Sequence, residues 1–235
     1  MVNGKIADWK RKDPWNGKTF LLLMLLEFGL VIFLVKGTMQ PLYDQWLGNS
    51  LYAGTLTGAT IALILLTGVY FLALKPHNET CLAVGVRPFL KKDWGIIILC
   101  VLFLLAAGAA VMAAVSFFGV SYENSKTDTL TGDIAPSAIL LALVSAAVIS
   151  PLYEEIFYRG FLYRWLRTRL GVGAGILLSS LIFTAAHYPV TNAMPINFLD
   201  GIVFAWAYEK THSIWPAVII HGVVNAVSIL LVVFL

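Results

Sequence analysis

Two adjacent glutamates and an arginine stand in a stretch of the chain that is otherwise apolar. Glu154, Glu155 and Arg159 follow the apolar run 139–149. Ionisable groups at the centre of a bilayer cost roughly 2.5–3.5 kcal/mol each, so the chain must gain something by keeping them. On a helix, Glu155 and Arg159 lie one turn apart in the favoured order for an ion pair, whereas Glu154 faces about 140° away from Arg159. We therefore expect Arg159 to hold Glu155 and Glu154 to be available for acid–base chemistry. The structural alternative is two glutamates at a helix end among lipid headgroups.

Three further polar side chains stand in apolar segments nearer the C-terminus. His187 ends one such segment, while His221 and Asn225 are four residues apart, so a helix places both on one face. At 1.5 Å per residue, Glu154, His187 and His221 lie roughly 15, 20 and 12 Å from the inner boundary. Three helices would thus place a carboxylate, two imidazoles and an amide in one layer. This set is typical of a hydrolytic site, although a packed, hydrogen-bonded histidine is the plainer interpretation of each ring alone.

The residue types favour water as the nucleophile. A glutamate in low-dielectric surroundings can take a proton from water that a histidine orients. The other imidazole and the amide can then donate hydrogen bonds to the oxyanion of a tetrahedral intermediate. The serines near this layer, at positions 150, 179 and 180, have no base at a spacing typical of a catalytic triad.

A metal is the open alternative for the same residues. One Glu and two His are a known donor set for catalytic zinc, which here would be Glu154, His187 and His221. The HExxH spacing is absent, however, and the ligands would have to come from three helices. A divalent metal such as zinc therefore stays open, and no other cofactor is expected.

The composition excludes an ordinary soluble domain. Hydrophobic residues make up 59% of the 235 residues and charged residues 12%, about half of the usual charged share of about 25%. In a membrane, this length predicts one all-α, polytopic bundle with about seven transmembrane helices, six to eight being possible. Cys81 and Cys100 form no CxxC pattern, so neither a thiolate metal site nor a disulfide framework is predicted. No nucleic-acid partner is expected.

Seven apolar segments are expected to form the helices that position these side chains. They cover about 20–35, 51–74, 94–120, 136–169, 174–188, 195–208 and 214–235. The fourth begins at Pro136, a good first-turn residue, carries both glutamates and is broken at Gly171-Val172-Gly173. Residues 1–18 form a polar, basic arm before the first apolar run. This start resembles a signal peptide, but no convincing small-x-small cleavage site precedes Lys36, so we expect the first span to be retained.

The placement of positive charge predicts the orientation in the membrane. Fourteen of the sixteen Lys and Arg lie in the arm or in segments that would share its side, around 75–92, 159–169 and 210. Lys36 and Lys126 would lie on the other side. This bias predicts an integral membrane protein with a cytoplasmic N-terminus and an outer C-terminus, which we expect in a bacterial plasma membrane.

Three motifs in chain order resemble those of a known family. The CPBP family, which comprises CAAX proteases and bacteriocin-processing enzymes and is also called the abortive-infection family, has motifs similar to Glu154-Glu155-x-x-x-Arg159, Phe183-x-x-x-His187 and His221-x-x-x-Asn225. Residues 197–216 also resemble the family pattern. The resemblance covers about residues 136–230, which would be the catalytic core of a single integral membrane domain, residues 1–235.

The resemblance implies an intramembrane endopeptidase whose cavity opens toward the cytoplasm. It implies that Glu154 and His187 activate water, that His221 and Asn225 form an oxyanion hole, and that Glu155 and Arg159 support the geometry. The substrate would be a peptide or a membrane protein embedded in the lipid bilayer. CAAX-type cleavage of prenylated tails, peptide maturation and bacteriocin immunity are the candidate processes. Of the metallo- and metal-free mechanisms discussed for the family, we favour the metal-free one.

Two interpretations without proteolysis also fit parts of the sequence. A non-catalytic membrane scaffold or immunity protein that binds a peptide or sensor partner would keep the motifs for packing. A proton-coupled transporter would use Glu27, in the middle of the first span, with Glu154 and Glu155 as relay groups, but the chain lacks the repeats expected of many transporters. Glu27 and Asp200 are further candidates for either a functional or a structural role.

Overall fold

Helices make up nearly all of the regular structure in the computed structural model, which describes residues 12–117, 135–188 and 193–234. Helices are expected because lipid offers the backbone N–H and C=O groups no partners. Five helical rods within these ranges are long and apolar enough to cross a membrane: Gly17–Leu47, Ser50–His77, Lys91–Ala114, Pro136–Leu170 and Ile214–Phe234. Val172–Ala186 is a shorter apolar helix. The predicted polytopic all-α bundle is confirmed, while the count of seven spans stays a prediction.

The first rod is longer than the predicted span 20–35. It consists of α2 (Gly17–Met24), the π-helical η1 (Leu25–Met39) and α3 (Gln40–Leu47). The predicted span ended with the apolar run at residue 35, but the helix continues through Lys36 and Pro41, and Pro41 lies where the π-helical η1 passes into α3. The rod ends at Gly48, whose φ of 61° lies in the left-handed region that favours glycine. Asn49 then caps the next helix.

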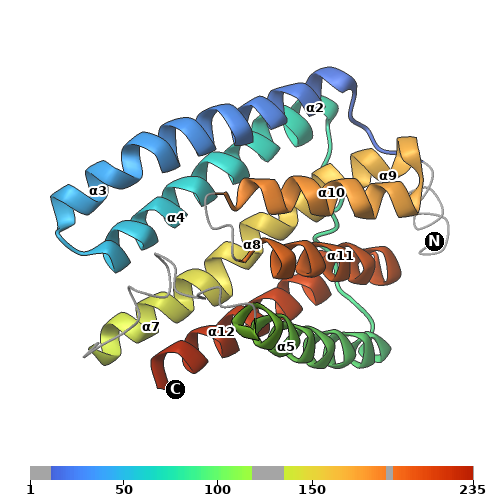
Figure 1. Cartoon of the computed structure of the whole chain (residues 1–235). Coiled ribbons are helices and arrows are strands. Elements are labelled where there is room, and N and C mark those ends of the chain that lie inside the picture. The colour runs from blue at the N-terminus through green and yellow to red at the C-terminus, as the bar shows by residue number, and fades with distance from the viewer. Residues whose placement is uncertain (1–11, 118–134, 189–192, 235) are drawn as a thin grey trace.

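The second and third rods pack on different parts of the bundle. The second rod consists of α4 (Ser50–Gly68), η2 (Val69–Leu74) and η3 (Lys75–His77), and it pairs with the first rod. The third consists of η4 (Lys91–Asp93) and α5 (Trp94–Phe117). In Figure 1 the paired first two rods lie on one side of the bundle and α5 lies on the other. Lys126, predicted to lie on the outer side, falls outside the described residues.

The rod that carries the glutamates runs between these two sides (Figure 1). It begins at Pro136 as predicted and consists of α7 (Pro136–Val144), η5 (Ser145–Ile149), α8 (Ser150–Glu154), η6 (Glu155–Tyr163) and α9 (Arg164–Leu170). Three helices follow: α10 (Val172–Ala186), α11 (Met194–Thr211) and α12 (Ile214–Phe234). The π-helical segments η5 and η6 flank α8, and such wide turns are frequent at functional sites.

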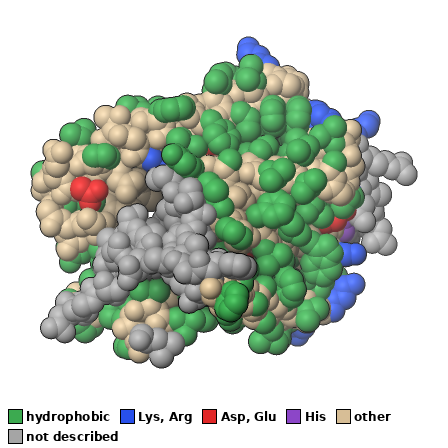
Figure 2. All heavy atoms as spheres, viewed as in Figure 1, with side chains coloured by type: hydrophobic (Ala, Val, Ile, Leu, Met, Phe, Trp, Pro, Cys, Tyr) green, Lys and Arg blue, Asp and Glu red, His purple; other side chains and the backbone are tan. Residues whose placement is uncertain are grey.

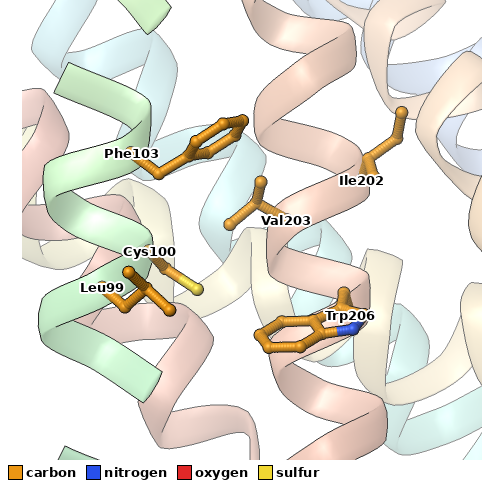
Figure 3. Close-up of a pocket in the computed structure, with 6 residues that line it drawn as sticks. All are labelled: Leu99, Cys100, Phe103, Ile202, Val203 and Trp206. Atoms are coloured by element: carbon orange, nitrogen blue, oxygen red, sulfur yellow. The ribbon is translucent and has the colours of Figure 1, made fainter. Parts of the chain in front are cut away.

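An apolar cavity of about 270 Å³ lies between parts of α5 and α11, which also pack against each other. Figure 3 shows that three side chains from each helix line it: Leu99, Cys100 and Phe103 from α5, and Ile202, Val203 and Trp206 from α11. None of the six is a candidate catalytic residue, so this cavity does not mark the predicted chemistry.

The basic end of α9 fastens neighbouring segments together. Arg167 donates two hydrogen bonds, of 2.6 and 2.8 Å, to Glu209 of α11. Arg169 Nη1 lies 2.6 Å from Asp13 Oδ2 in the N-terminal arm. Arg164 donates to the carbonyl of Ala83. Figure 2 shows Lys and Arg side chains at the edge of the molecule where α9 lies in Figure 1, beside a largely hydrophobic face. The predicted basic charges therefore include structural anchors.

Candidate active site

The glutamate rod and two helices packed against it, α10 and α12, bring the predicted glutamates and histidines together. Glu154 ends α8, Glu155 begins η6, His187 directly follows α10, and His221 lies in the middle of α12. The segment η6 contacts both α10 and α12. Both glutamates and His221 are buried, with exposed fractions of 7%, 0% and 6%. The layer expected from helix depth thus exists as a set of neighbouring side chains, whose catalytic roles stay predictions.

Arg159 and Glu155 form the predicted ion pair. Arg159 Nη1 lies 3.1 Å from Glu155 Oε1, and both side chains are almost completely buried. The guanidinium lies 4.4 Å from the ring centroid of Phe183 and 5.0 Å from that of Phe204. Its Nη2 donates to the carbonyl of Gly201 at 3.4 Å. Because a buried charge needs a partner, Arg159 and Glu155 each supply the partner that the other requires at the centre of the bundle.

Glu154 points to a different set of partners, as its position on the helix predicted. Its Oε1 accepts a hydrogen bond from the Ser150 hydroxyl, one turn earlier on the same helix. Its Oε2 lies 4.0 Å from His187 Nε2 and 3.9 Å from His221 Nε2. One carboxylate oxygen is thus held by a side chain, while the other faces two imidazole nitrogens.

The hydrogen bonds of the two rings assign their protons. His187 Nδ1 lies 2.8 Å from the carbonyl oxygen of Phe183, which only accepts, so Nδ1 carries the proton. The Nε2 lone pair of a neutral His187 then faces Glu154. His221 Nδ1 lies 3.0 Å from Glu155 Oε1 and donates to it. His221 Nε2 therefore donates only when the ring carries both protons.

The gap between Glu154 and His187 matches one water molecule. A water with two hydrogen bonds of about 2.8 Å can bridge acceptors that are 4.0 Å apart. It would donate one proton to each acceptor, which leaves an oxygen lone pair free to attack. The arrangement can therefore activate water by general base catalysis.

A tetrahedral zinc ion does not fit the same donors as they stand. Zinc ligands at 2.0–2.1 Å lie roughly 3.4 Å from one another. Glu154 Oε2 is 3.9 and 4.0 Å from the two Nε2 atoms. Within the described ranges, no group of three or more His, Cys, Asp or Glu side chains has the geometry to hold a metal ion.

Asn225 contacts another part of the bundle. Its Nδ2 donates to the carbonyl of Ala146 in η5 at 2.8 Å, which ties α12 to the glutamate rod. The neighbouring Gly222 makes the close approach feasible, since a Cβ there would lie 2.3 Å from the Ala147 carbonyl oxygen. An amide nitrogen has two N–H groups, so this bond uses one of them. The oxyanion role predicted for Asn225 therefore depends on its second N–H group.

Sequence reasoning missed several groups around the cluster. Ser150 stands four residues before Glu154, a spacing that gives a local signal, but it had been considered only as a nucleophile. The Tyr158 hydroxyl donates to Glu27 Oε1 at 2.7 Å, which gives the predicted candidate Glu27 a partner. Lys36 Nζ donates to the carbonyl of Ala186 at 2.7 Å. Nothing in the sequence signals these last two long-range contacts.

The two candidates of uncertain role are both near the cluster. Glu27 is 3% exposed and interacts electrostatically with Glu154. Asp200, on α11, interacts electrostatically with His221 and Arg159. Both therefore belong to the electrostatic surroundings of the site.

One family model matches the part of the chain that carries the three motifs. Residues 136–227 match the family described as Rce1-like, Type II CAAX prenyl endopeptidase Rce1-like. The Rce1-like segment contains all six candidate residues of the sequence analysis, and the resemblance to CAAX proteases is confirmed.

Curated proteins similar to this chain occur in bacteria. The chain is 24% identical over 128 residues to a putative membrane peptidase, YdiL, of Bacillus subtilis, covering 54% of this chain and 51% of that protein. It is 27% identical over 125 residues to an uncharacterized 24.3 kDa protein of Escherichia coli, covering 50% and 58%. The chain spans about half the length of the curated relatives it matches. No solved structure matches it.

Proposed function

We propose that this protein is an intramembrane endopeptidase that hydrolyses a peptide bond with water activated by Glu154 and His187. The observation that carries the proposal is the position of Glu154 Oε2, 4.0 Å from His187 Nε2 and 3.9 Å from His221 Nε2. The Rce1-like segment supports proteolysis as the chemistry.

In the proposed reaction, the Glu154 carboxylate takes one proton from water and later transfers it to the leaving amine. The water oxygen attacks the carbonyl carbon of the substrate while Glu154 takes its proton and His187 Nε2 accepts the second hydrogen bond. The carbonyl oxygen becomes an oxyanion, which doubly protonated His221 and the second N–H of Asn225 stabilise by donating hydrogen bonds. When the C–N bond breaks, Glu154 returns its proton to the leaving amine. Glu155 and Arg159 keep the His221 ring in place.

We propose that the reaction needs no metal. The support is geometric, because the separations between Glu154 and the two imidazoles suit a bridging water better than a tetrahedral zinc shell. If a metal does bind after adjustment of the side chains, Glu154, His187 and His221 would hold it and it would polarise the water or the carbonyl.

We propose a peptide or a membrane protein as the substrate, met in a bacterial plasma membrane. Bacterial relatives and the apolar rods support this setting. The charge bias supports a cytoplasmic N-terminus. Removal of a prenylated CAAX tail, peptide maturation and bacteriocin immunity are the specific processes to separate by experiment.

The test is a cleavage assay with purified protein in detergent or liposomes. A farnesylated CAAX peptide, the same peptide without the lipid, and a pool of unmodified peptides are incubated with wild type, and products are identified by mass spectrometry. Glu154→Gln keeps the shape of the side chain and removes the base, so we expect kcat to fall by about 10²–10⁴-fold with the fold intact. Exposed Glu79 provides the matched control, Glu79→Gln.

Two outcomes would contradict the proposal. Full activity in Glu154→Gln would remove the glutamate as base, and a cellular phenotype that survives this substitution would indicate a binding protein. Ser150→Ala separates the nucleophiles: water attack predicts a modest loss, because Ser150 only orients Glu154, whereas a serine nucleophile predicts complete loss.

A further inference from the structure

The first helical rod touches both helices that carry the proposed water-activating pair, although it lies outside residues 136–227. On one side, Glu27 accepts the 2.7 Å hydrogen bond from Tyr158, which is one turn beyond Glu154. On the other side, Lys36 donates its 2.7 Å hydrogen bond to the carbonyl of Ala186, the residue before His187. The rod therefore bridges the glutamate helix and the histidine helix.

Both contacts suit the chemistry of the groups involved. Glu27 is buried, and a buried carboxylate needs a hydrogen-bond donor. Ala186 is the last residue of α10, where carbonyl groups lack partners within the helix and the helix dipole favours a cation. Lys36 thus caps a helix from a distance of 150 residues in sequence.

The Lys36 contact bears directly on the His187 ring. His187 Nδ1 makes a hydrogen bond to the carbonyl oxygen of Phe183 in the last turn of α10. A shift of that turn therefore moves Nε2 relative to Glu154 Oε2, now 4.0 Å away. Since Glu27 and Lys36 belong to one continuous helical rod, its backbone fixes the spacing between their two contacts.

We propose that the first rod is a positioning element that sets the Glu154–His187 separation, with Lys36 and the Glu27–Tyr158 pair as its two attachments. Lys36 and Glu27 act through other residues and touch no reacting atom. The inference rests on the proposed function, because the separation matters only if these two residues activate water.

A double-mutant cycle on kcat tests the proposal. Lys36→Met removes one attachment and Tyr158→Phe removes the other while keeping the ring. Each is expected to lower kcat by about 10-fold with KM changed less than about twofold, since small misplacements of reacting groups are costly. The kcat of the double variant is expected to be only slightly lower than that of either single variant, because the loss of either attachment already releases the Glu154–His187 separation. Lys36→Arg, which keeps a charged donor, should restore most of kcat, and exposed Lys18→Met on the same rod should leave it unchanged.

The controls separate this inference from the function on which it rests. Melting temperature is recorded for every variant, and Lys36→Gln replaces Lys36→Met in the cycle if the latter does not fold. The positioning role would be overturned if folded Lys36→Met had the kcat of wild type, or if the losses of the two single variants added up in the double variant. In either case the proposed function would still stand as long as Glu154→Gln is inactive. Active Glu154→Gln would instead overturn the proposed function itself.

Discussion

Arg159 gives the sharpest test of the buried charge arrangement. The Arg159→Met substitution keeps much of the aliphatic stem and removes the guanidinium, which leaves the Glu155 anion facing His221 alone. Breaking a buried pair in this way costs on the order of 3–5 kcal/mol. Loss of the contacts with Phe183 and Phe204 adds on the order of 1 kcal/mol.

The expected loss is large enough to measure. The two losses together are on the order of 4–6 kcal/mol. Chains of this length lose roughly 2–4 °C of melting temperature per kcal/mol, so Arg159→Met should melt roughly 8–24 °C below wild type. Intrinsic fluorescence of the seven tryptophans reports the transition in detergent. Activity should be lost as well, because Arg159 no longer holds the Glu155 carboxylate that accepts the hydrogen bond from His221.

A second substitution checks the reasoning. Glu155→Gln added to Arg159→Met removes the stranded anion, while the amide oxygen can still accept from His221 Nδ1. The double variant should therefore melt above Arg159→Met. A double variant that melts as low as the sum of the two single losses would refute the view that an uncompensated charge causes the instability. Wild-type stability in Arg159→Met would refute it outright.

Three further predictions concern packing, pH and metal. Gly222→Ala places a Cβ 2.3 Å from the Ala147 carbonyl oxygen and should therefore displace α12. The variant should have a lower melting temperature and lower cleavage activity although no reacting group changes; a folded, fully active variant would contradict this. At the end of α11, burial alone would raise the pKa of Glu209, but hydrogen bonds from Arg167 and Tyr163 outweigh it and hold the pKa below 4.5. This contribution to stability is therefore present above the pKa of an unfolded glutamate and disappears as pH falls through the lower folded value, and Glu209→Gln should flatten that part of a melting-temperature profile measured from pH 6 to 3. Chelators should leave turnover unchanged, whereas chelator-sensitive turnover that returns with added zinc would establish a metal mechanism.

Local spacing predicted the parts of the site that depend on one helix. The Glu155–Arg159 pair follows from four-residue spacing, and the opposite orientation of Glu154 follows from the helical angle. The helix starting at Pro136 and the break before Gly171 follow from proline and glycine chemistry. Helix rise was enough to place His187 and His221 near the depth of Glu154.

Contacts between helices could not be derived in the same way. In a membrane, apolar side chains face both the lipid and the protein core, so polarity does not reveal which face packs against a neighbour. The bond from Asn225 to Ala146 and the contact of Lys36 with Ala186 depend on such crossings. Lys36 was predicted to lie beyond the first span because the apolar run ends at residue 35, whereas it lies inside the longer helical rod and donates a hydrogen bond to the last residue of α10.

The partners of the first rod have a consequence for how the chain is made. Tyr158 follows Glu27 by 131 residues and Ala186 follows Lys36 by 150. At about 5–20 residues per second of synthesis, the ribosome needs roughly 7–30 s to produce these partners after the first rod emerges. During that interval a carboxyl and an ammonium group must be accommodated in the nascent helix without the contacts that later satisfy them. Delayed insertion of this helix, or its shielding by the insertion machinery until the glutamate rod arrives, is the physical requirement that follows.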